Sequence, residues 1–162
     1  MRKTRLRFAT LALGLLAAAC QDPTSPSIHL DKLLSAPLTV DIGGRAYRLE
    51  TFVCRDFMPP TNLEGSTLVA VVYLTADDGL PFPDEIGAPK LWVVQGEEVW
   101  EAAFGYEERP RSLLRLDQVT KIASGGPRWD VGSEVEVIVL ITESSRNPRL
   151  LRATKQIIAR TE

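Results

Sequence analysis

The sequence has few residues of the types that build metal sites and nucleophilic active sites. It contains two cysteines, Cys20 and Cys54, and one histidine, His29. Four cysteine or histidine ligands at short spacing make a structural zinc site, so this composition excludes one. A Cys54–His29 pair is an alternative, but we expect a buried, structural thiol and a solvated imidazole. The sequence also lacks a glycine-rich phosphate loop ahead of a helix, and it predicts no catalytic residue, metal or cofactor.

The sequence also lacks an apolar run of the roughly 20 residues that span a bilayer. A shorter run covers residues 8–19, follows four basic residues and ends in three alanines directly before Cys20. This arrangement resembles the signal peptide of bacterial lipoproteins. The resemblance implies that residues 1–19 are removed and that the thiol of Cys20 carries lipid. A transmembrane anchor and an ordinary secretory signal are the alternatives.

The residues after Cys20 have no apolar periodicity. The stretch QDPTSPS over residues 21–27 contains two prolines, which favour an extended tether on the order of 20 Å long. Lipoproteins with Asp directly after the cysteine are held at the inner membrane, and this chain has Gln21 there, so the resemblance implies the outer membrane. We therefore divide the chain into a signal peptide (1–19), a lipidated cysteine with its tether (20–36) and a folded domain (37–162).

The chain has no excess of basic residues outside the signal. Four of its 19 Lys and Arg residues lie in residues 1–19, which leaves 15 against 21 Asp and Glu residues, a net charge of −6. An acidic surface argues against nucleic acid as a partner, so the lipid on Cys20 has to supply the affinity for the membrane. Once Cys20 is acylated, Cys54 has no partner for an intrachain disulfide.

Alternating apolar and polar residues predict strands over most of the domain. Gly43 and Gly44 predict a hairpin that pairs Val40 with Tyr47 and Leu38 with Leu49. Residues 68–74 are apolar without a break and predict a central strand buried on both faces. A second hairpin is expected over residues 91–104, and further strands over 113–123, 135–141 and 150–158. Residues 28–36 fit either a short helix or an added edge strand.

These strands predict an all-β fold, an antiparallel immunoglobulin-like β-sandwich of about seven to eight strands, with a small β-barrel as the alternative. The stretch PRWDVGSEVEVIVLI, residues 127–141, resembles the corner that precedes a late core strand in immunoglobulin-like and fibronectin-like domains. The resemblance implies that its aromatic residue, Trp129, caps the sandwich.

Large apolar side chains in hairpins and loops are the candidate binding surface. A three-residue loop in the second hairpin would place Trp92 and Trp100 on one face of the hairpin. If this face points outward, the two rings can stack on a ligand; if it points inward, as we favour, they fill the core between the sheets. Phe57 and Met58 lie in one proline-containing loop and Phe82 in another. Acidic residues around the second loop, at 77, 78, 84 and 85, suggest a calcium site as an alternative to a solvated turn.

The sequence as a whole favours a membrane-anchored envelope lipoprotein that acts as a non-enzymatic binding or accessory module for an envelope protein or a glycan. One alternative is an inhibitor or assembly factor that contacts a client through the proline-rich loop at residues 81–89. The other alternative is an enzyme of unrecognised type.

Overall fold

The structure, a computed structural model, describes residues 29–58, 64–109, 115–143 and 146–162. Within these ranges the chain forms ten strands and one short helix. The elements in chain order are α1 (Leu30–Leu34), β1 (Thr39–Ile42), β2 (Arg45–Asp56), β3 (Leu68–Ala76), β4 (Ile86–Gln95), β5 (Glu98–Ala103), β6 (Tyr106–Glu108), β7 (Gln118–Gly126), β8 (Glu134–Glu143), β9 (Arg146–Ile157) and β10 (Ala159–Thr161).

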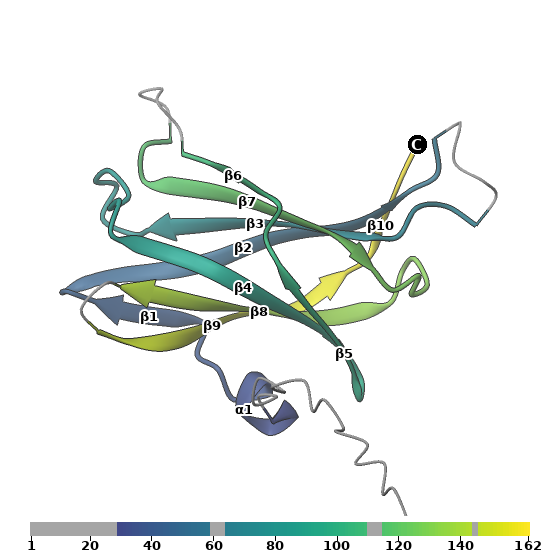
Figure 1. Cartoon of the computed structure of the whole chain (residues 1–162), viewed down its shortest axis with the longest axis horizontal. Coiled ribbons are helices and arrows are strands. Elements are labelled where there is room, and N and C mark those ends of the chain that lie inside the picture. Colours follow the sequence, from purple (N-terminus) through teal and green to yellow (C-terminus); the bar gives the residue numbers. More distant parts are fainter. Residues whose placement is uncertain (1–28, 59–63, 110–114, 144–145) are drawn as a thin grey trace, which may run out of the picture.

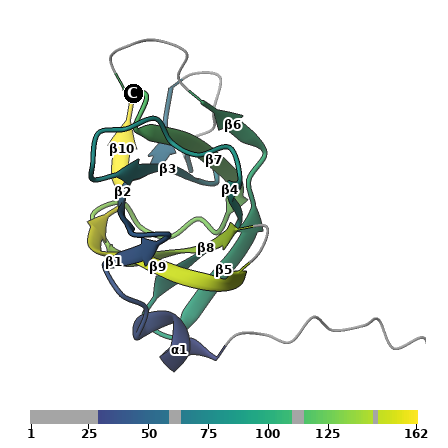
Figure 2. The same cartoon turned by 90° about the vertical axis from the view of Figure 1, so that its left-hand side faces the viewer.

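The strands form two sheets that pack face to face (Figures 1 and 2). Sheet A has the order β1-β2-β3-β7-β6, with β10 added in parallel to β2, and sheet B has the order β5-β4-β8-β9. The strands β2-β3-β7-β6 and β5-β4-β8-β9 match the orders A-B-E-D and C′-C-F-G of immunoglobulin-like domains. The predicted antiparallel β-sandwich is confirmed, with ten described strands instead of about seven to eight, and these strands form two layers rather than a barrel.

The first hairpin has the predicted register. Val40 pairs with Tyr47, and the turn residues Gly43 and Gly44 both have positive φ, 65° and 81°, as a two-residue hairpin turn of this kind requires. The predicted pair of Leu38 and Leu49 is absent from the ladder, because β1 begins at Thr39 and Leu38 is 54 % exposed.

Strand β3 lies at the centre of sheet A, as predicted for residues 68–74. From residue 68 to residue 74 its side chains alternate between fully buried positions in the core between the sheets and half-buried positions on the opposite side. The expectation that it is buried on both faces is wrong, because Val69, Val71 and Tyr73 point to the outer face of sheet A and are covered only in part.

The second hairpin has a two-residue turn, Gly96-Glu97, instead of the three-residue loop that would place both tryptophans on one face. Trp92 pairs with Glu101, whereas Trp100 pairs with Val93, so the two rings lie on opposite faces of sheet B. Trp100 packs on the core between the sheets, where a Cβ at Gly126 would lie 2.7 Å from its ring. Only a glycine leaves room for this contact.

Helix α1 covers the outer face of sheet B. Its residue Leu33, together with Ala36, packs on Trp92, Val94 and Ile138 in an apolar cluster separate from the main core. The helix alternative for this segment is confirmed, and the folded domain begins before residue 37, since Leu33 is fully buried. In the described residues, no helix is long and apolar enough to cross a membrane.

Trp129 and Arg55 close one end of the sandwich. Trp129, the aromatic residue expected to cap the fold, is buried ahead of β8, and its Nε1 donates to Glu98 Oε2 at 2.6 Å. Arg55 is also buried and donates through Nε to Ser66 O (3.0 Å) and through Nη1 to Trp129 O (3.1 Å). The guanidinium thus joins the segment between β2 and β3 to the segment before β8.

We expect Trp92→Ala to lower the free energy of unfolding by about 3–5 kcal/mol, because the ring is only 2 % exposed and its loss leaves a cavity under α1. Val99→Ala, at an exposed position on the neighbouring strand β5, is the control and should change stability by no more than about 0.5 kcal/mol. Urea unfolding of the two variants measures this difference. Equal stabilities would contradict the burial of Trp92.

Candidate functional site

A buried lysine lies at the edge of the sandwich between the two sheets. Lys121 on β7 alternates with outward-facing residues and points inward, like Val119 and Ala123 of the core. Its Nζ donates to Ala88 O at 2.6 Å and forms an ion pair with Glu107 Oε2 at 2.7 Å. The lysine therefore joins β7 of sheet A to β4 of sheet B.

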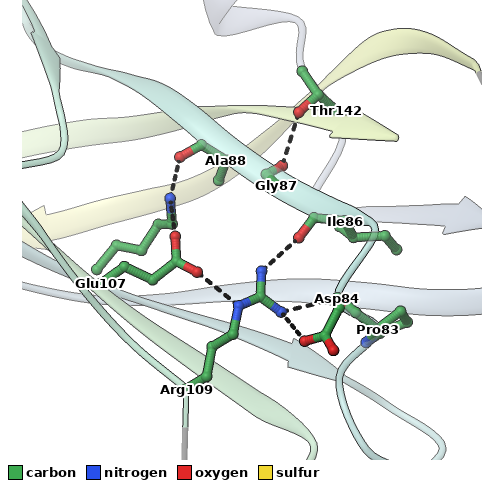
Figure 3. A network of polar contacts seen from close by, with 9 residues as sticks. Pro83, Asp84, Ile86, Gly87, Ala88, Glu107, Arg109 and Thr142 are labelled. Carbon is green, nitrogen blue, oxygen red and sulfur yellow. Dashed lines mark hydrogen bonds and ion pairs between the residues drawn. The ribbon is translucent and has the colours of Figure 1, made fainter. Parts of the chain in front are cut away.

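Arg109, just after β6, continues this network (Figure 3). Its Nε donates to Glu107 Oε1 at 2.7 Å, and its two terminal nitrogens donate to the carbonyl oxygens of Pro83 (3.0 Å) and Ile86 (2.9 Å). Its guanidinium carbon also lies 5.7 Å from the centre of the Phe82 ring. These contacts hold the proline-rich loop against the edge of sheet A.

The charged groups of this network are suited to holding the loop in place rather than to catalysis. The hydrogen bond from Lys121 holds the pKa of the Glu107 carboxyl below its usual range, so this group stays ionised at neutral pH. A general acid or base works best with a pKa near the operating pH, and the environment of Glu107 moves its pKa away from that range. We therefore assign the network to positioning of the loop.

Two of the four acidic residues of the same loop, Asp77 and Asp78, are paired with arginines. Arg45 contacts both carboxylate oxygens of Asp78, at 2.6 and 2.8 Å, and Arg48 forms an ion pair with Asp77. Each carboxylate is thus compensated by a guanidinium, which disfavours a cation at the same oxygens. In the part of the chain that the structure describes, no three His, Cys, Asp or Glu side chains are close enough together to hold a metal ion.

The structure does not bring His29 and Cys54 together. His29 precedes α1 on the outer side of sheet B, whereas Cys54 follows the core residue Val53 on β2 and points to the outer face of sheet A. The sandwich lies between the two side chains. Burial raises the pKa of the Cys54 thiol, which lowers the thiolate fraction and therefore its reactivity.

The five side chains of the predicted binding surface do not form one patch. Trp92 lies under α1, Trp100 packs on the core, and Phe82 is buried in the core. Phe57 is half-buried between two guanidinium groups, with Arg160 at 4.1 Å from the ring centre, and Met58 beside it is 49 % exposed.

The outer face of sheet A carries an apolar row that sequence reasoning missed. Phe52 on β2 pairs with Val71 on β3, Val71 pairs with Ile122 on β7, and Ile122 pairs with Tyr106 on β6. Because paired residues in adjacent strands point to the same side, these four side chains form one line across the sheet, which we call the outer row. Its terminal rings are exposed, Phe52 at 45 % and Tyr106 at 51 %.

A second line of side chains runs beside the outer row. It begins at Glu50, passes through Tyr73 and Thr120, and ends at Glu108, so each exposed ring has a carboxylate two residues away on the same strand and face. Tyr106 Oη donates to Glu108 Oε2 at 3.4 Å. The face thus offers flat apolar contact along one line and acceptor oxygens at both ends of the next.

We expect Cys54 to react with a thiol reagent much more slowly in the folded protein than in denaturant, because the side chain is buried and its pKa is raised. Cys54→Ser should lower the free energy of unfolding by on the order of 1 kcal/mol or more, since it buries a hydroxyl. Reaction at equal rates in both states would overturn the structural role of this thiol.

We expect Glu107→Gln to lower the free energy of unfolding at pH 7 by about 1–3 kcal/mol, because the buried Lys121 loses its counter-charge. The pKa of Glu107 is depressed in the folded state, so its stabilisation is present above the unfolded pKa and disappears as pH falls through the lower folded value. The difference between wild type and variant should therefore shrink below about pH 4.

Urea unfolding at pH 7 and pH 3 measures this effect. Glu97→Gln, the same chemical change at the exposed turn of the second hairpin, is the control and should have little effect at either pH. A difference between wild type and Glu107→Gln that is as large at pH 3 as at pH 7 would show that the charge of Glu107 does not stabilise the fold.

Comparison with known proteins leaves the chain without a family. No protein-family model matches it, and neither the curated proteins nor the solved structures include a match. The functional assignment therefore depends on the chain's own residues.

Proposed function

We propose that the protein is a lipoprotein of the bacterial cell envelope, anchored to a membrane through lipid on Cys20, whose sandwich is a non-enzymatic binding module. The observation that carries this proposal is the outer row on sheet A, whose two terminal rings, Phe52 and Tyr106, are exposed. Exposed apolar side chains scattered singly are ordinary, but two exposed rings joined by a line of half-buried apolar side chains indicate a contact surface.

The place where the described chain begins supports the proposal that the outer row is a binding surface. The described chain begins at His29, and α1 packs on the outer face of sheet B, so the described N-terminal end of the domain lies on the side opposite to the outer row (Figure 2). If residues 21–27 are extended, as their two prolines favour, they hold the domain on the order of 20 Å from the lipid surface. We propose the outer membrane as its location.

The partner that we propose is an envelope protein or a glycan. Acidic composition, with a net charge of −6 after residue 19, disfavours nucleic acid. The chemistry of the described side chains also favours binding over catalysis, since the polar network at Glu107 and the thiol of Cys54 both serve the fold.

A second candidate is an inhibitor or assembly factor that uses the proline-rich loop. Arg45 donates to the carbonyl oxygens of Leu80 (3.0 Å) and Pro81 (3.1 Å), while the Leu80 side chain remains exposed. A loop held in this way presents an apolar side chain to a client at a low cost in conformational entropy.

We expect the full chain to partition with membranes and to incorporate labelled fatty acid, and Cys20→Ser to abolish both. Two or more acyl chains are needed for stable anchoring, so the loss should be nearly complete. Cell fractionation with metabolic labelling measures it, and Cys54→Ser is the control that should keep the label. A Cys20→Ser protein that remains labelled would refute the lipid anchor.

A further inference from the structure

We propose that β5, at the edge of sheet B (Figure 1), binds an extended basic peptide of a partner protein, which pairs with β5 as an additional strand. The inference goes beyond the outer row, because β5 belongs to the other sheet and the two surfaces share no residue. The peptide is recognised through its backbone, through alternate apolar side chains and through basic side chains.

Strand β5 offers an uninterrupted edge. It pairs with β4 alone over Glu98–Ala103, in a continuous register without a bulge, and it contains no proline. Strand β9, at the other edge of sheet B, is interrupted, since Arg152 N donates to Pro37 O at 2.9 Å and Lys155 has a φ of 54°. The edge strands β1 and β6 of sheet A are only four and three residues long. An open edge is a template for pairing with another chain.

The turn of the second hairpin determines which backbone groups of β5 are available. A two-residue turn makes Gln95 and Glu98 a hydrogen-bonded pair, and pairs with and without hydrogen bonds then alternate along the ladder. The N–H and C=O groups at positions 99, 101 and 103 therefore point away from β4. Within the described part of the chain, they form no backbone hydrogen bond outside the sheet ladder. Three donors and three acceptors at two-residue intervals match the hydrogen-bond pattern of an added strand.

The side chains beside this edge define an apolar pattern for the peptide. Trp100 and Ala102 point to the space between the sheets, where they are half-buried and pack on the margin of the core. Residues of an added strand that lie opposite these two point to the same side, so apolar side chains there extend the core. The next inward residue, Phe104, is also half-buried and prolongs this apolar margin.

The acidic residues of the hairpin determine the charge of the peptide. Glu97 in the turn and both Glu98 and Glu101 on β5 are exposed. Lys90 on β4 is ion-paired with Glu101, so the hairpin edge carries three carboxylates against one ammonium. Lysine and arginine side chains of an added strand gain opposite-charge contacts here, whereas acidic side chains are repelled.

The same carboxylates disfavour a second copy of this chain as the occupant. In an antiparallel ladder, outward-pointing positions of one strand pair with outward-pointing positions of the other. The register between two β5 strands that uses all three such positions places the two Glu101 side chains opposite each other. Like charges directly opposite destabilise a pair of strands, so charge favours a different, basic chain.

The test is titration of the full chain, extracted in non-ionic detergent, with a capped eight-residue peptide of alternating valine and lysine. NMR spectroscopy measures both the affinity and the exchange of single amide protons. We expect saturable binding, and we expect the amide protons at positions 99, 101 and 103 to exchange about tenfold more slowly or less in the complex, because they gain acceptors. A peptide with glutamate in place of lysine should bind at least about tenfold more weakly.

Val99→Pro tests the backbone pairing, since proline at this position removes an outward N–H and no hydrogen bond to β4. We expect it to weaken peptide binding by about tenfold or more. Val99→Ala is the matched control, because it shortens the same side chain, keeps the N–H and should bind like wild type. Phe52→Ala, in the outer row on sheet A, should also bind like wild type, which separates the two surfaces.

Two results on the wild-type chain overturn the inference without any variant. They are binding of the lysine peptide that is weaker than millimolar, and binding that leaves amide exchange at positions 99, 101 and 103 unchanged. Unchanged affinity of a Val99→Pro protein that is folded, as judged by thermal unfolding, also overturns it. A dimer of the full chain in sedimentation that Val99→Pro dissociates would replace the peptide with a second copy.

Discussion

The sandwich depends on the apolar layer between its sheets, because no disulfide joins the described strands and Cys54 is a free thiol. Two inward-pointing cations stand at the margins of this layer. Lys121 donates to Ala88 O, and Arg55 donates to the carbonyl oxygens of Ser66 and Trp129. Since a buried cation without acceptors is strongly destabilising, formation of the core also fixes the segments that supply these carbonyl groups: β4 at Ala88, and the loops that contain Ser66 and Trp129. The loops are therefore held by the same packing that holds the sheets.

This packing gives the two outer faces different roles. Each sheet buries one face in the common core and leaves the other to be covered or exposed. Helix α1 covers sheet B through Leu33, which contacts a cluster that contains Trp92. On sheet A, the corresponding outward positions of β3 are half-buried and those of β2 and β6 include exposed rings. Helix α1 therefore lies on one side of the sandwich, and the exposed rings of the outer row lie on the other.

The sequence predicted the features that local chemistry determines and missed those that register determines. Gly43 and Gly44 both accept positive φ, which limited the first hairpin to a two-residue turn and fixed its pairing. Gly96 alone is compatible with loops of two or three residues, and a one-residue difference decides whether Trp92 and Trp100 share a face. The outer row was missed for the same reason, since its members come from four strands that are distant in the sequence. Sequence periodicity gives the side to which each residue points, but not its neighbours.

The exposed ends of the outer row have no stabilising role that explains them. Phe52 and Tyr106 leave about half of their surface in water, so a polar residue with high strand propensity, such as threonine, would serve the fold at little cost. Two rings at opposite ends of one line, each with a glutamate two residues away, form an arrangement that the packing of the sandwich does not require. The binding role that we propose for the sandwich would account for this arrangement.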